Sequence, residues 1–66
     1  MPSIKPKEVF FEFTTVGTTI RVVAVDAHTG TEVSLQVPHT LSQSDMQKIA
    51  LRKLIYVMGK EEKKKK

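Results

Sequence analysis

The sequence predicts an α+β fold, a three-stranded antiparallel meander followed by one C-terminal helix packed on one face (β-β-β-α). Three observations predict it. Runs rich in β-branched and aromatic residues fill the first half of the chain, and short glycine-containing links separate them. A segment with helical spacing of apolar residues follows. Because the links are short, consecutive strands should pair antiparallel.

The three expected strands differ in how their apolar residues alternate. Residues 8–15 (EVFFEFTT) form the first strand, and Gly17 after it tolerates the positive φ of a tight hairpin. Residues 18–27 (TTIRVVAVDA) are apolar on both faces, which is typical of a central strand. Residues 31–37 (TEVSLQV) alternate cleanly, as a strand with one buried face does.

The expected helix begins after Ser42, with Ser44 as a competing N-cap. It ends near Met58, because Gly59 suits the left-handed position that stops a helix. Its apolar stripe spans roughly 180° of the helix surface, whereas packing on a small sheet needs only about 100°. The predicted core joins inward-facing strand residues to this stripe: Phe11, Phe13, Ile20, Val22, Val33, Leu35, Ala50, Leu54 and Val57.

A chain of 66 residues forms one small domain. We expect a folded part at residues 8–59, between a flexible arm at 1–7 with two prolines and a disordered basic tail at 60–66. The formal net charge is +4, and the five lysines and two glutamates of the tail supply +3 of it. The folded part is therefore nearly neutral.

The residue types that are missing limit how the chain is stabilised and where it works. It contains no cysteine, which excludes disulfides and thiolate zinc sites. No apolar run has the length of a signal peptide or a membrane span. We therefore expect a cytoplasmic protein that does not contact a membrane. A domain this small buries only about 60% of its unfolded surface, so self-association is the remaining source of stability.

The segment VDAHTGTEV, residues 25–33, gathers the side chains from which a metal site would be built. Asp26 and His28, joined by His39, would make a minimal ligand set, but their spacing matches no motif with a known mechanism. A turn accounts for more of the residues. Asp26 then accepts backbone N–H bonds, Gly30 takes a positive φ, and His28 is exposed at the tip. We expect a turn, with no metal and no other cofactor.

No catalytic arrangement is visible in the sequence. There is no cysteine nucleophile, and no serine has evident histidine and aspartate partners. The three glycines are isolated and form no phosphate-binding pattern. We expect a protein that is not an enzyme and has no small-molecule substrate.

Two sets of residues outside the predicted core indicate a macromolecular partner. Apolar side chains favour a homodimer or binding to another protein, and this is the preferred prediction: Phe10, Val23, Val25, Leu51, Ile55 and Met58. Basic side chains offer the alternative of weak nucleic-acid binding, assisted by the lysine tail: Arg21, Lys48, Arg52 and Lys53. On the expected outer sheet face one arginine stands beside two acids, a poor arrangement for reading phosphate.

The phrases VFFEF, VG and IRVVAVDAHTGTEV, followed by ALRKLIYVMGK, resemble a family of small uncharacterised proteins from alphaproteobacteria. The resemblance spans residues 8–60 and rests on the strand–turn phrase around Asp26, Thr29 and Gly30 and on the helix. It implies a bacterial cytoplasmic origin. It brings no activity, substrate, cofactor or site residue with it, and the terminal EEKKKK lies outside the shared pattern.

Overall fold

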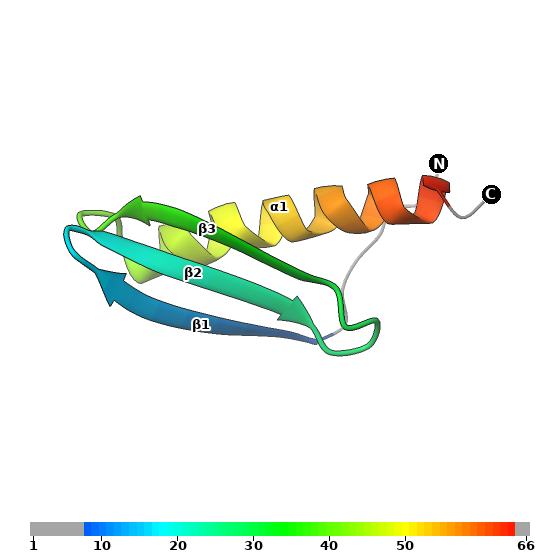
Figure 1. Ribbon diagram of the computed structural model, residues 1–66, viewed down its shortest axis with the longest axis horizontal. Helices are drawn as coiled ribbons and strands as arrows, with labels where there is room; N and C mark the ends of the chain where they lie inside the picture. The colour runs from blue at the N-terminus through cyan, green and yellow to red at the C-terminus, as the bar shows by residue number, and fades with distance from the viewer. Residues whose placement is uncertain (1–7, 65–66) are drawn as a thin grey trace.

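The computed structural model describes residues 8–64 and has the predicted α+β fold (Figure 1). Its strands are β1 (Val9–Val16), β2 (Thr19–Asp26) and β3 (Glu32–Pro38), and its helix is α1 (Gln43–Lys64). The sheet order is β1-β2-β3, and both neighbouring pairs are antiparallel. The predicted meander is confirmed, with strand ends shifted by one residue. The predicted arm, residues 1–7, lies outside the described residues.

Gly17 makes the tight hairpin between β1 and β2. Its φ is 61°, and it occupies the first central position of a two-residue loop, as in a type II′ turn. The Thr19 hydroxyl donates to the Val16 carbonyl across this loop at 2.9 Å. The turn therefore fixes Val16 opposite Thr19, and the whole β1–β2 register follows from that pair.

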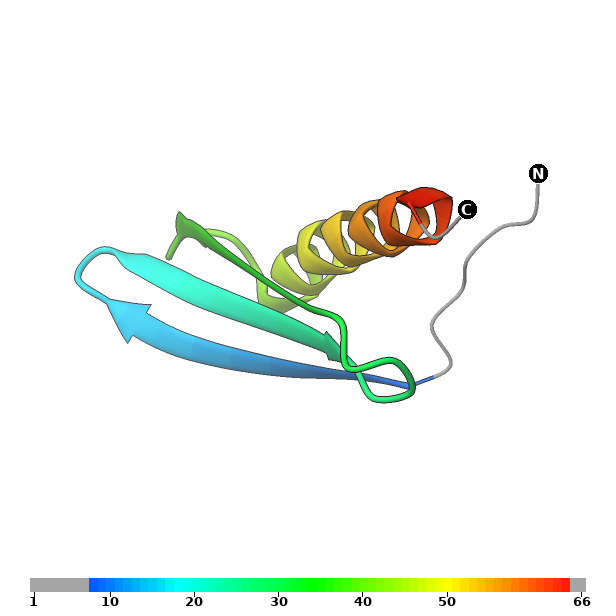
Figure 2. The same ribbon diagram turned by 45° about the vertical axis from the view of Figure 1, so that its right-hand side comes forward.

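The strand register separates the sheet into two faces. Phe13 lies opposite Val22, which lies opposite Leu35, and this row belongs to the inner face, on the side of α1. The next row, Glu12 with its partners on β2 and β3, belongs to the outer face, because successive strand residues point to opposite sides. Figure 2 shows α1 on one side of the sheet, with none of the described elements on the other.

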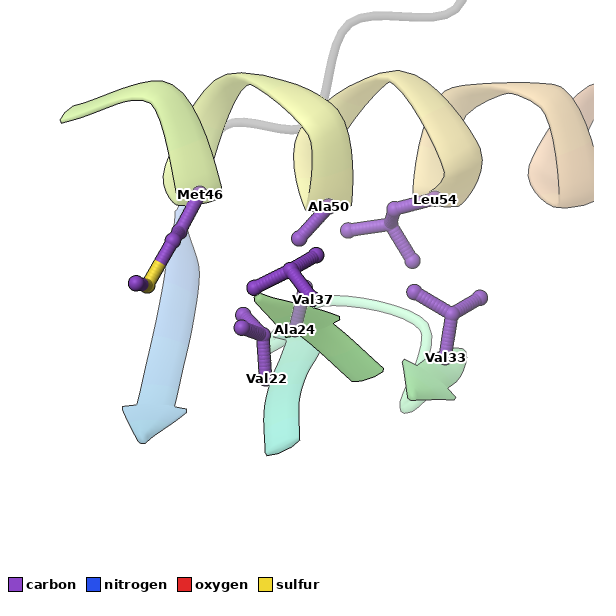
Figure 3. Packing of buried hydrophobic residues seen from close by; sticks show 7 residues of the cluster. All are labelled: Val22, Ala24, Val33, Val37, Met46, Ala50 and Leu54. Atoms are coloured by element: carbon purple, nitrogen blue, oxygen red, sulfur yellow. The ribbon is translucent and has the colours of Figure 1, made fainter. Parts of the chain in front are cut away.

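The core lies between α1 and the two strands β2 and β3, against which the helix packs (Figure 3). Its buried residues are Val22, Ala24, Val33, Val37, Met46, Ala50 and Leu54. Three of these, Ala24, Val37 and Met46, were not among the predicted core residues. Five predicted ones are only half-buried and pack around the margin: Phe11, Phe13, Ile20, Leu35 and Val57. The helix lies over β2 and β3, which leaves the inner residues of β1 at the margin.

Only one end of the helix follows the prediction. Ser42 is the N-cap, because its Oγ accepts the Asp45 N–H at 3.1 Å and its carbonyl accepts the Met46 N–H at 3.0 Å. The predicted end at Met58 is wrong, since α1 continues through Gly59 to Lys64, into the segment expected as a tail. A glycine inside a helix costs only about 1 kcal/mol, and the glutamates and lysines beyond it are good helix formers. Residues 65–66 lie outside the described part.

Candidate protein interface

Asp26 closes the turn between β2 and β3. It ends β2 on the inner face and is 1% exposed. Its Oδ2 accepts the Thr29 hydroxyl at 2.6 Å and the Thr29 backbone N–H at 2.9 Å. The hydroxyl bond, assisted by the N–H, lowers the pKa of Asp26, although burial opposes the shift. Gly30 has a φ of 81° and donates its N–H to the Asp26 carbonyl at 2.8 Å. The carboxylate thus holds the turn together, as predicted.

The residues considered as metal ligands are not brought together. His28 is exposed at the tip of the turn. His39 lies at the opposite end of the sheet, where its N–H donates to the Thr18 carbonyl at 3.3 Å. Among the described residues, no three histidine, aspartate or glutamate side chains lie close enough to hold a metal ion. The second Asp26 oxygen, Oδ1, is buried, and no group within the described residues 8–64 donates a hydrogen bond to it.

The three predicted interface residues on the sheet form one apolar group on the outer face. Phe10 lies directly opposite Val25, and Val23 is two residues before Val25 on β2, in the neighbouring row of the same face. Phe10 is 57% exposed, whereas Val23 and Val25 are half-buried between neighbouring side chains. Val16, at the far end of β1 on this face, is 46% exposed and was missed by the prediction. It follows a strand pattern up to the turn glycine, and that pattern was the signal that could have found it.

The predicted interface residues on the helix lie on the other side of the sheet. Lys53 extends over β3, where its ammonium donates to the Ser34 carbonyl at 3.3 Å. Residues two positions apart in an α-helix point about 200° away from each other. Leu51 and Ile55, each two positions from Lys53, therefore lie on the opposite flank of the helix, on the β1 side. Both are half-buried. Met58 instead packs against the core. The six predicted residues therefore do not form one continuous surface.

Strand β1 lies between these two apolar groups and is poorly covered on both faces. On the inner face, Phe11 and Phe13 are half-buried, because α1 packs on β2 and β3. On the outer face, no described element covers the strand. Its long edge is also the edge of the sheet. We call this region the β1 surface, and it comprises Phe10, Val16, Phe11, Phe13, Leu51 and Ile55.

The basic residues of the alternative prediction are divided between the two sides of the molecule. Arg21 lies on the outer sheet face, opposite Thr14 and Gln36. Lys48 and Arg52 are exposed on α1, on the other side of the sheet. Lys53 donates a hydrogen bond to the Ser34 carbonyl at the β3 edge. These four residues therefore do not lie together on one face of the described part of the molecule.

Comparison with known proteins gives a family and no activity. A family model described as a domain of unknown function (DUF6898) matches residues 6–62. No curated protein and no solved structure matches the chain. In the part of the chain that the structure describes, α1 lacks the apolar composition that would let a helix cross a membrane.

Proposed function

We propose that this chain, which belongs to the DUF6898 family of unknown function, acts by binding protein in the cytoplasm and not by catalysis. Its first partner is a second copy of itself. One observation carries the proposal: after the chain has buried its own core, two apolar side chains of the β1 surface remain exposed, Phe10 by 57% and Val16 by 46%, and the other four are only half-buried. An apolar group of this kind on a small domain marks a protein contact.

The distribution of large and small apolar residues supports the same conclusion. The buried core contains alanines, valines, one methionine and one leucine. All three phenylalanines of the chain, Phe10, Phe11 and Phe13, lie on β1, and none of them is fully buried. Burying one such side chain stabilises a protein by about 1.5–3 kcal/mol. A symmetric dimer buries each residue twice, which is a large gain for a domain near the lower size limit of independent folding.

Sedimentation velocity over a range of protein concentrations tests self-association, with a matched pair of variants. Phe10→Thr removes an exposed apolar side chain from the β1 surface. Ile49→Thr removes one from α1, where Ile49 is 39% exposed outside the β1 surface. We expect the wild type to form a dimer at tens of micromolar. Phe10→Thr should weaken the dimer about tenfold or more, because burying such a side chain contributes about 1.5–3 kcal/mol, which exceeds the value of about 1.4 kcal/mol that corresponds to tenfold in Kd. Ile49→Thr should have no effect on association.

Two results would argue against the proposal. A wild-type protein that sediments as a monomer throughout the range, and binds no dye that reports apolar surface, has no contact of this kind to make. Equal weakening by both variants would mean that association is not specific to the β1 surface. Circular dichroism of each variant verifies that the fold is intact before association is compared.

A further inference from the structure

The peptide groups of β1 divide into two sets by the direction in which they point. The Ala27 N–H donates to the Glu8 carbonyl at 3.0 Å, so these two residues form a hydrogen-bonded pair. Hydrogen-bonded pairs alternate along an antiparallel ladder. The even-numbered residues of β1 therefore bond to β2, and the N–H and C=O groups of Phe11, Phe13 and Thr15 point away from it, along the edge of the sheet.

The other edge of the sheet is protected, whereas the β1 edge is not. On β3, the Lys53 ammonium binds the outward-facing Ser34 carbonyl, and the strand ends at Pro38. A lysine and a proline are two common means by which proteins block an edge strand. The eight residues of β1, VFFEFTTV, contain neither, and Glu12 is their only charge. Strand β1 is therefore the edge that can accept another strand.

We propose that a second copy of this chain pairs with β1 antiparallel, about a two-fold axis that passes through Phe13. The proposal rests on the proposed function and specifies its geometry. A two-fold axis that relates antiparallel strands stands perpendicular to the sheet. The two copies together then form one six-stranded sheet, with both helices on the same face.

The side chains of the outer face select the register. The axis keeps the faces of the two copies together, so only registers that pair residues of the same face are allowed. An axis through Glu12 places the two Glu12 carboxylates directly opposite each other, which is destabilising. An axis through Phe13 places Glu12 opposite the partner's Thr14. It also places Phe10 opposite the partner's Val16, so that the two exposed apolar residues of the strand cover each other.

The same register satisfies the free peptide groups. Phe13 meets the partner's Phe13, and Phe11 meets the partner's Thr15 on each side of the axis. All of these residues direct their N–H and C=O groups toward the partner, which gives about six hydrogen bonds between the chains. On the inner face, the Phe13 side chains meet at the axis. Leu51 and Ile55 lie on the flank of α1 that faces this axis, so each helix helps to cover the β1 of the partner.

Disulfide trapping tests the register directly, because the chain has no cysteine of its own. Phe10→Cys and Val16→Cys are made in separate chains, which are mixed and gently oxidised. Both positions are exposed, so the fold of the single chain is preserved, and Glu12 is retained. Directly opposed residues have Cα separations within the range that a disulfide spans. We expect the mixture to form a covalent dimer about tenfold or more in excess of either variant alone.

Two control mixtures distinguish the competing arrangements. Phe10→Cys mixed with Thr14→Cys reports the register in which Glu12 lies on the axis. Phe10→Cys mixed with Ser34→Cys reports contact with the β3 edge, and we expect neither mixture to form the bond. A dominant bond in either control overturns the Phe13 axis. A dimer by sedimentation without the Phe10–Val16 bond overturns the Phe13 axis and leaves the proposed function standing, whereas a monomer by sedimentation removes both.

Discussion

A proline at Thr15 would separate the hydrogen bonds of the monomer from those between two copies. Thr15 is exposed on an edge strand, and its N–H points away from β2. Proline is tolerated at such a position, because no bond among residues 8–64 of the same chain is lost. In the proposed dimer, the Thr15 N–H donates to the partner's Phe11 carbonyl, twice by symmetry. At about 0.5–1.5 kcal/mol net for each bond, Thr15→Pro costs about 1–3 kcal/mol of association, or about 5- to 150-fold in Kd.

The matched control places the same residue one position earlier. Thr14 lies opposite Arg21, and its N–H bonds to β2, so Thr14→Pro breaks the sheet of the monomer itself. Circular dichroism should show a folded Thr15→Pro variant and an unfolded or severely destabilised Thr14→Pro variant. Sedimentation velocity then gives the dimer Kd of Thr15→Pro. An unchanged Kd would refute pairing along β1, and unfolding of Thr15→Pro would refute the assignment of its N–H to the free edge.

Three further variants test how the monomer is held together. Leu54→Ala empties the largest fully buried side-chain site, and the free energy of unfolding should fall by about 2–5 kcal/mol in chemical denaturation. Gly17→Ala meets no atom within 4 Å but forces alanine to a φ of 61°, and thermal melting should show a loss of about 1–2 kcal/mol. Thr29→Val removes the hydroxyl that lowers the pKa of Asp26, and should lower the midpoint of chemical denaturation near pH 7. A carboxylate whose pKa is lowered by folding stabilises the folded state at pH values above its unfolded pKa of about 4. This stabilisation is lost as the pH falls through the folded pKa, so the difference in stability between wild type and Thr29→Val should shrink in acid.

The order and pairing of the elements could be predicted because each is determined locally. The period of two in the strands, Gly17 and the Asp26–Gly30 turn, and the N-cap at Ser42 all depend on neighbours within a few residues. The end of the helix depended on a competition that residue types alone do not decide. Gly59 was given too much weight against the helix formers that follow it.

The position of the helix over the sheet could not be predicted, and the candidate interface depends on it. Residue types do not show that α1 packs on β2 and β3, which buries Ala24 and Val37 and leaves Phe11 and Phe13 at the margin. The prediction therefore found apolar residues in excess without finding that they surround one strand. Val16 was missed because it was counted as part of the turn and not of the strand.

Amide hydrogen exchange measured by NMR at two protein concentrations tests self-association through β1 most directly. The amides of Phe11, Phe13 and Thr15 face the free edge, so they should exchange rapidly at low concentration and become protected where the dimer forms. The outward-facing amides of Ser34 and Gln36 on the β3 edge should exchange at the same rate at both concentrations. Self-association through β1 would be contradicted if the three β1 amides exchange rapidly under conditions where the protein is dimeric. It would also be contradicted if the Ser34 and Gln36 amides become protected in their place.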